Sequence, residues 1–385
     1  MNYALQKTLE LLLIIGLGLL LQKKVAKNDL KGIKTLILSV ALPATIFVAL
    51  LKIELKGSLL IFPLMALVFN FIMAITTKYV LTSSLPKNEG AKKRTLTMLL
   101  PSLAPGLSCF PFIIVYLGDE YLALAALADV GNKIFVLILL YMLGMHWYHA
   151  RAIKDLVAST SSKLKGLFIS MLNEPINLVI IIALVLLGFG LSLSSFPDFL
   201  ENTIVKMSLI MTPLVLLFIG MAVRIKFSEF GFIFSLLMRR AGITFLLSAI
   251  FVFLFPALGA SMILFIVVFP QSACSFWPFA HMSAVSTLEE KDGQKKPTFD
   301  INFAVNILAC SLPFSTILII SIFSFSEFFV NPLVLLIAGL IMTGITYVPF
   351  LINKLKGIKS NKTEESVNYN TFFGINTNAH STDNN

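Results

Sequence analysis

The sequence has little charge and few cysteines. Only 13% of its 385 residues are charged, whereas 57% are hydrophobic and the mean hydropathy is +0.89. Soluble domains carry about 25% charged residues, so a soluble globular fold is excluded. The three cysteines lie in apolar stretches without metal-like spacing, which argues against a disulfide framework or a zinc site. The sequence also has no Gly-rich phosphate-binding loop. We therefore expect no cofactor and no bound metal.

The basic residues are unevenly placed along the chain. The formal net charge is +10, and most of the 30 Lys and Arg side chains fall in alternate loops between apolar stretches. Cytoplasmic loops of membrane proteins carry such an excess and face anionic lipid. The pattern predicts a multi-pass protein of the cell inner (plasma) membrane with its N-terminus outside and its C-terminus cytoplasmic. It indicates contact with the lipid bilayer and not with nucleic acid.

Eleven stretches are apolar enough to cross a membrane, which takes about 20 residues. The predicted spans are Tyr3–Leu21, Ile33–Leu51, Ser58–Leu81, Leu96–Leu117, Tyr121–Met145, Ile176–Leu193, Ile204–Val223, Ala241–Ala260, Ser261–Ala280, Ile301–Phe323 and Phe328–Leu351. The segment Phe230–Met238 is interpreted as an interfacial lead-in to the eighth span. An odd number of spans agrees with termini on opposite sides of the membrane.

Two of the predicted spans contain several prolines. Pro101, Pro105 and Pro111 interrupt the fourth span, and Pro270 and Pro278 interrupt the ninth. Each proline removes a backbone donor and clashes with the preceding turn, so a continuous helix is not expected. Lipid cannot satisfy the freed backbone groups, so such breaks pack in protein or line a wet cavity. Interrupted spans at corresponding places in two halves are typical of a secondary transporter's binding site.

The chain repeats itself with an offset of about 170 residues. The matched landmarks are Gly16 with Gly188, Pro43 with Pro213, Pro111 with Pro278, and Asn132 with Asn306. Because the unit has five spans, the second copy enters the membrane upside down. The sequence therefore predicts an all-α polytopic membrane protein. It would have two inverted five-helix repeats with broken crossover helices (the fourth and ninth spans), plus an extra C-terminal eleventh span.

The same repeat divides the chain. The predicted divisions are a first five-span repeat with its cytoplasmic loop (1–166), a second, inverted repeat (167–325), an additional C-terminal span (326–359) and a disordered cytoplasmic tail (360–385).

Two opposite charges lie inside the fifth predicted span. Lys133 would sit about 18 Å from the start of that span at 1.5 Å per residue. Such a charge is costly in the bilayer and marks a functional site by default. Asp129 is four residues earlier, on the same helix face. The two could form an internal ion pair that neutralises itself. We favour a part in binding or coupling, in which Lys133 attracts an anion, or Asp129 binds a proton or cation whose transit exposes the lysine.

Small polar residues flank the predicted breaks. Their hydroxyls can cap freed backbone amides, whose positive ends would face a small anion. The alternative is that they only allow close helix packing. The candidate substrate-binding residues are Lys133, Asp129, Asn132, Ser108, Cys109, Pro111, Ser272, Ser275, Phe276, Pro278 and Asn306.

Two other functions stay open. Ser261 lies in a loose G-x-S-x pattern and His281 follows it, as an intramembrane serine hydrolase would need, although such short patterns arise freely in apolar chains. A passive channel or a sensor on the same fold is the second alternative. The oligomeric state, with a homodimer as one option, and the direction of transport are also open.

Four stretches carry a resemblance to a known family. They are Ile37–Ala44, Phe112–Asn132, Asn173–Pro197 and Thr212–Met221. Over about residues 1–325 they resemble the auxin efflux carrier family, within the bile acid/arsenite transporter group. The chain departs from the family pattern at Pro105, where the family often has Asn six residues before the proline of the fourth span. Its eleventh span is also extra, since the family would end near Ser324.

The resemblance implies a ten-span inverted repeat whose broken helices cross at a midplane site. It also implies transport of carboxylates such as auxin in plants, or malate and malonate in bacteria. The predicted function is therefore that of a permease that moves a small organic anion, such as a mono- or dicarboxylate, by alternating access. The driving force would be a proton or sodium gradient or the substrate's own gradient. We do not expect an enzyme.

Overall fold

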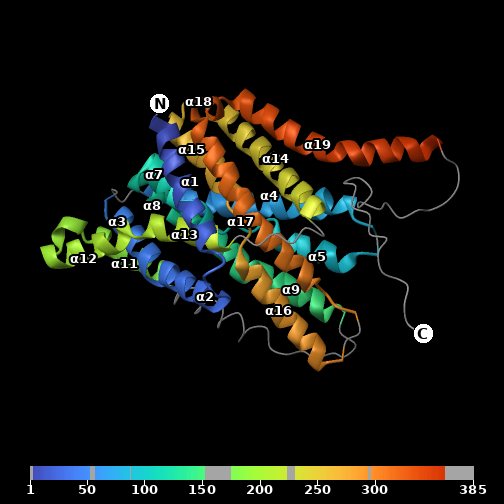
Figure 1. Cartoon of the computed structure of the whole chain (residues 1–385), viewed down its shortest axis with the longest axis horizontal. Coiled ribbons are helices and arrows are strands. Elements are labelled where there is room, and N and C mark those ends of the chain that lie inside the picture. Colours follow the sequence, from blue (N-terminus) through green and yellow to red (C-terminus); the bar gives the residue numbers. More distant parts are fainter. Residues whose placement is uncertain are drawn as a thin grey trace.

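The computed structural model describes residues 3–52, 57–86, 88–151, 175–222, 230–293 and 296–359, and these residues form helices and no strand (Figure 1). Within these ranges seven helices are long and apolar enough to cross a membrane, and three apolar helices are shorter. This is the architecture of a membrane-embedded helical protein, as the composition predicts. The predicted division between residues 166 and 167 and the predicted tail 360–385 lie outside the described ranges.

The first three predicted spans form α1, a composite helix and α4. Their bounds are α1 (Tyr3–Leu21), α2 (Lys27–Leu36), a π-helical turn (Ile37–Ala41), α3 (Leu42–Leu50), a short 3₁₀ turn (Gly57–Leu60) and α4 (Ile61–Tyr79), followed by a second 3₁₀ turn (Leu81–Ser84). The π turn precedes Pro43, which has no backbone N–H for the regular helical ladder. The second span therefore changes its winding at its proline without breaking.

The fourth predicted span is broken into short helices, and the fifth is continuous. Their bounds are α5 (Gly90–Leu99), α6 (Pro105–Ser108), α7 (Phe110–Leu117), α8 (Asp119–Lys133), a π-helical turn (Ile134–Leu139) and α9 (Leu140–His149). Gly118 joins α7 to α8 with φ +88°, a conformation that glycine adopts without strain. The predicted break is confirmed.

The second half contains the remaining helices. Their bounds are α11 (Pro175–Gly188), a 3₁₀ turn (Leu193–Ser195), α12 (Asp198–Leu209), α13 (Met211–Ala222), α14 (Phe230–Leu254), α15 (Ala260–Val268), a 3₁₀ turn (Phe269–Gln271), α16 (Phe276–Lys291), α17 (Ile301–Ser324), α18 (Ser326–Phe329) and α19 (Pro332–Lys359). The segment Phe230–Met238, interpreted from the sequence as an interfacial lead-in, belongs to the same continuous helix as the eighth predicted span. This segment contains no proline and buries Ile233 and Leu236, so α14 continues straight through it.

Glycines allow three pairs of helices to approach closely. A Cβ on Gly131 of α8 would lie 1.9 Å from the carbonyl oxygen of Pro63 in α4. A Cβ on Gly18 of α1 would lie 2.4 Å from the carbonyl oxygen of Leu217 in α13. Gly242 allows a similarly close contact between α14 and α19. The helix α19 packs alongside α14 and then extends away from the other helices (Figure 1). Small residues at such contacts are typical of helices packed in membranes.

The helices pack in two groups. One group is α1, α3, α11, α12 and α13, in which α1 lies along α13, and α3 packs on α11 and α12. The other contains α4, α5, α8, α9, α14, α16 and α17, in which α4 packs on α8, and α14 and α16 pack on α17. The two groups meet where α8 contacts α3 and α11, and where α1 contacts α17.

Candidate functional site

The two interrupted spans meet at their breaks. Residues 102–104, after α5, and residues 272–275, before α16, are not helical. The backbone N–H of Ala104 donates to the carbonyl oxygen of Ala273 at 2.8 Å. The N–H of Ala273 donates to Oγ of Ser108 at 3.0 Å. We call these two bonded segments the crossing, and it joins the two halves of the sequence.

Serine hydroxyls satisfy much of the remaining backbone at the crossing. Oγ of Ser102 accepts the N–H of Ser275 at 3.0 Å and donates to the carbonyl oxygen of Leu99 at 2.6 Å. Oγ of Ser275 accepts the N–H of Trp277 and so caps α16. Oγ of Ser272 donates to the carbonyl oxygen of Phe269. The capping that the sequence predicts is present, although Ser102 was not among the predicted residues.

Asn132 holds the first break from the side of α8. Its Nδ2 donates to the carbonyl oxygen of Leu103 at 2.9 Å, and its Oδ1 accepts the N–H of Leu103 at 3.1 Å. One amide side chain thus satisfies both backbone groups of a non-helical residue. The same Nδ2 donates to Oδ1 of Asp129 at 2.8 Å, and Nδ2 of Asn70 in α4 donates to Oδ1 of Asn132 at 3.1 Å.

Asp129 and Lys133 form a buried ion pair on α8. Nζ of Lys133 lies 3.4 Å from Oδ2 of Asp129, and both side chains are only 6% exposed. Nζ also donates to Oδ1 of Asn177 at 3.0 Å. A buried pair offsets its desolvation cost only when further hydrogen bonds satisfy both partners, and Asn132 and Asn177 supply such bonds. Because Asn177 lies on α11, Lys133 also links the two groups of helices.

Arg240 is a functional candidate that the sequence reading missed. Arg239 and Arg240, just before the eighth predicted span, are only 3% and 2% exposed. Nε of Arg240 donates to the carbonyl oxygen of Leu100 at 2.8 Å, and its Nη2 donates to that of Ser102 at 3.3 Å. The end of α5 exposes carbonyl groups that attract a cation. The sequence feature that could have identified Arg240 is a basic residue inside an uninterrupted apolar helix.

Three buried amide side chains were also missed. Besides Asn177, they are Asn70 and Gln271, whose Nε2 donates to the carbonyl oxygen of Ala241 at 3.1 Å. Oδ1 of Asn70 and Oε1 of Gln271 are buried with no hydrogen-bond partner. Such oxygens are acceptors for a proton-bearing or cationic ligand. The described residues contain no group of three or more His, Cys, Asp or Glu that could hold a metal ion.

Three other predicted site residues lie at helix starts near the crossing. Cys109 is fully buried at the kink between α6 and α7, with Sγ 3.9 Å from the carbonyl oxygen of Val268. Pro111 is buried in the first turn of α7, where its missing N–H leaves no helical bond unmade. Pro278 is buried near the start of α16. The prolines therefore begin helices after the breaks.

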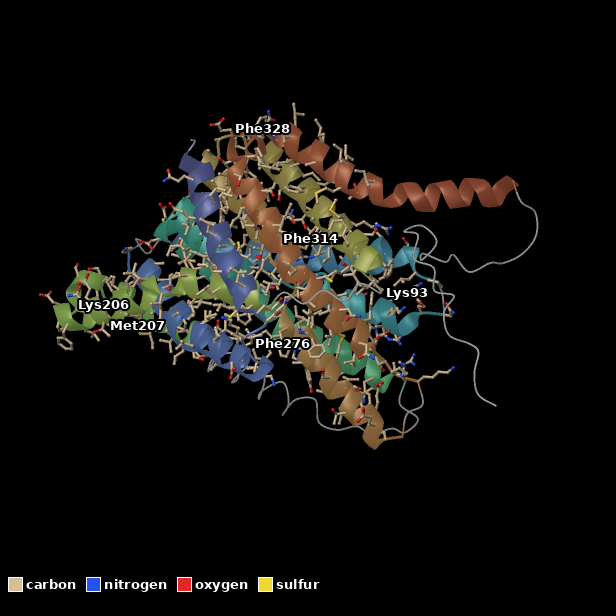
Figure 2. The ribbon with its side chains drawn as sticks, in the orientation of Figure 1. Lys93, Lys206, Met207, Phe276, Phe314 and Phe328 are labelled. Carbon is tan, nitrogen blue, oxygen red and sulfur yellow. The ribbon has the colours of Figure 1, made fainter. Side chains whose placement is uncertain are left out.

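Phe276 and Asn306 are less enclosed than the other predicted residues. Phe276 is 51% exposed near the middle of the view in Figure 2, and Nζ of Lys34 lies 4.8 Å from its ring centroid. That cation–π contact links α2 to α16. Asn306 lies half-buried on α17.

Ser261 and His281, the residues of the hydrolase alternative, have other partners. Ser261 is exposed in the first turn of α15 and makes a side-chain hydrogen bond with Tyr121. His281 is buried in α16, with Nε2 3.0 Å from the carbonyl oxygen of Val136.

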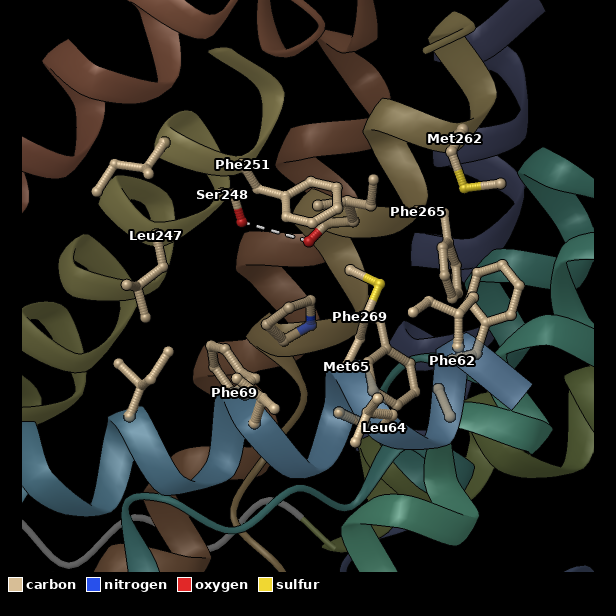
Figure 3. A pocket seen from close by; sticks show the side chains of 18 of the residues that line it. Phe62, Leu64, Met65, Phe69, Leu247, Ser248, Phe251, Met262, Phe265 and Phe269 are labelled. Atoms are coloured by element: carbon tan, nitrogen blue, oxygen red, sulfur yellow. Dashed lines mark hydrogen bonds between the residues drawn. The ribbon is translucent and has the colours of Figure 1, made fainter. Parts of the chain in front are cut away.

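An apolar cavity of about 530 Å³ lies between α4, α14 and α15 (Figure 3). Phe62, Phe69, Phe251 and Phe265 contribute to its wall. Its lining hydroxyl, Ser248, donates to the carbonyl oxygen of Ile266. The cavity therefore offers apolar contact beside the crossing and no acceptor or donor for a charged group.

No family model matches the chain, and no curated protein sequence matches it.

Proposed function

We propose that this protein is a secondary active transporter that moves a small organic anion across the cell membrane by alternating access, in the manner of the auxin efflux carriers that it resembles. The observation that carries the proposal is the crossing, where Ala104 and Ala273 pair two broken segments beside the ion pair of Asp129 and Lys133. Non-helical backbone at membrane depth is tolerated only inside protein or beside a wet cavity. Secondary transporters build their substrate sites at such breaks.

The spacing of the breaks supports the inverted repeat that this function needs. The non-helical segments begin at residues 102 and 272, an offset of 170 residues. Pro43 and Pro213, in the predicted second and seventh spans, have the same offset. In this proposal two five-helix repeats form the carrier, and α19 is an addition to it.

The ion pair suggests how a gradient would be coupled to transport. A proton or a sodium ion on the carboxylate of Asp129 would remove the negative charge that now balances Lys133. Lys133, which keeps its bond to Asn177, would then favour an anion in place of the carboxylate. Loading of the coupling ion would thus raise the affinity for the substrate.

Proteoliposomes test this function directly. Purified protein is given an inward proton or sodium gradient and a panel of labelled mono- and dicarboxylates. Lys133→Met should abolish gradient-driven uptake, while Lys206→Met should not, because Lys206 is exposed on α12 away from the crossing (Figure 2). Equal uptake by wild type and Lys133→Met would remove the coupling role. Uptake of none of the panel by the wild type would remove the proposed function.

Counterflow separates a carrier from a channel. Vesicles preloaded with unlabelled substrate should accumulate labelled substrate transiently without any imposed gradient, because a carrier exchanges the two on alternate faces. A channel would equilibrate the label without such an overshoot.

A further inference from the structure

The charges bonded to the crossing do not balance. Asp129 and Lys133 neutralise each other at 3.4 Å. Arg240 is as deeply buried, and the bonds that the structure gives it end on the carbonyl oxygens of Leu100 and Ser102. Among the described residues no carboxylate forms an ion pair with it. These three ionisable side chains therefore sum to one positive charge.

That positive charge is permanent. A guanidinium does not lose its proton in proteins, whereas a buried lysine can do so. An uncompensated buried charge is unfavourable because it has lost its water, and an anion within a few ångströms relieves the cost. Carbonyl oxygens compensate only part of it, because they carry partial charges.

Arg240 is attached to both breaks. Its own donors hold the first break at Leu100 and Ser102, and the hydroxyl of Ser102 accepts the N–H of Ser275 in the second break. The next residue on α14, Ala241, accepts a bond from Gln271 at the start of the second break. The bonds to Leu100 and Ser102 use two of the five N–H groups of the guanidinium, which leaves donors for a carboxylate.

We propose that Arg240 balances the charge of the bound substrate and that the crossing takes one negative charge, so that its ligand is a monovalent rather than a divalent carboxylate. With a monovalent anion, the ligand and the side chains of Asp129, Lys133 and Arg240 sum to zero. While Asp129 pairs with Lys133, before any coupling ion is loaded, a second negative charge would have no partner. This inference rests on the proposed transport function and narrows its substrate class.

Thermal-shift binding tests the inference without requiring transport. The purified protein is titrated with matched pairs, propionate and malonate, butyrate and succinate, and benzoate and phthalate, with butyramide as the uncharged control. At about pH 7.5 the carboxyl groups are ionised. A ligand that binds the native state raises the unfolding temperature. The wild type should prefer the monovalent member of each pair that binds, and butyramide should have no effect.

Variants of Arg240 identify the residue responsible. Arg240→Gln removes the charge and should weaken binding of the preferred monocarboxylate by about 30-fold or more. Arg240→Lys keeps the charge and should recover part of that loss, and it should keep the preference for the monovalent member of each pair. Lys206→Gln, on exposed α12, should bind as the wild type does.

The outcomes separate this inference from the proposed function. The inference would be overturned if Arg240→Gln bound the monocarboxylate as tightly as the wild type does, or if the divalent member of each pair bound more strongly. Transport in proteoliposomes would still support the proposed function. If Arg240→Gln fails to fold, two measurements still test the inference: the preference of the wild type for monovalent over divalent ligands, and the binding of the monocarboxylate by Arg240→Lys. Absence of both binding and uptake of every anion in the wild type would overturn the inference and the proposed function together.

Discussion

The backbone N–H of Ala104 donates to the carbonyl oxygen of Ala273 at 2.8 Å, and this bond joins the two broken spans of the chain. Each break leaves backbone groups that lipid cannot satisfy. At the crossing they are satisfied by the opposite break, by serine hydroxyls, and by Asn132 and Arg240. The crossing can therefore exist at membrane depth only while these side chains hold it.

Asn132→Leu should loosen the first break. The substitution leaves both backbone groups of Leu103 without their partner, and each buried orphan costs about 1–3 kcal/mol. We expect a loss of at least about 2 kcal/mol in the free energy of unfolding. Hydrogen–deuterium exchange should also become faster over residues 102–104. Asn202→Leu, on exposed α12, is the control. Unchanged exchange in Asn132→Leu would show that the break does not depend on α8.

Removing one partner of the buried ion pair should reduce the stability of the protein more than removing both partners. Asp129→Asn or Lys133→Met alone leaves an uncompensated buried charge and should destabilise the protein by about 3–5 kcal/mol. The double variant should lose much less than the sum of the two. Thermal unfolding of the four proteins measures the coupling.

An exposed pair provides the matched control for that cycle. Nζ of Lys52 lies 2.6 Å from Oδ2 of Asp119, with side chains 48% and 33% exposed. Because water screens such a pair, its cycle should give about 0–1 kcal/mol. Equal coupling energies for the two pairs would contradict the burial of Asp129 and Lys133.

Gly131→Ala should separate α4 from α8. The added Cβ would lie 1.9 Å from the carbonyl oxygen of Pro63, a backbone atom that cannot move alone. We expect a destabilisation of about 1–3 kcal/mol or more, measured by thermal unfolding. In Gly16→Ala the added Cβ meets nothing within 4 Å, and the better helix propensity of alanine should leave stability unchanged or slightly higher. A tolerated Gly131→Ala would mean that the two helices are less close.

The native thiols should resist a charged maleimide in the folded protein. Cys109, Cys274 and Cys310 are all buried and free. A Phe276→Cys variant, at a half-exposed position one residue after the crossing, should react faster by mass spectrometry. Alternating access would expose the crossing in another state, so substrate should change the rate at Cys274. Equal rates at Cys274 and position 276 without substrate would contradict the closed crossing.

Several features could be predicted from the sequence because their causes are local. The length of each apolar stretch, the effect of proline on the following helix, and the spacing of Asp129 and Lys133 all depend on residues a few positions apart. The breaks therefore lie in the predicted spans, and the two charges lie on one helix face. In the seventh predicted span, α12 ends at Leu209 and α13 begins at Met211, shortly before Pro213.

The position of the first break could not be predicted from local patterns. The match of Pro111 with Pro278 puts Ser108 opposite Ser275, but the non-helical residues begin at 102, and Ser102 is the residue that bonds to Ser275. With three prolines in the fourth span, the local pattern gives several places for a break. Which of these positions stays non-helical depends on the hydrogen-bond partners that tertiary packing places beside it.

By itself the sequence determined a charge-poor chain of apolar helices with two proline-broken spans and one buried pair of opposite charges. The tertiary structure decided that Asn132 holds Leu103, that Asn177 holds Lys133, and that Arg240 turns inward to the carbonyl groups after α5. These contacts join residues from separate helices. A buried polar group takes the partner that packing places beside it, and no local pattern in the sequence records which partner that is.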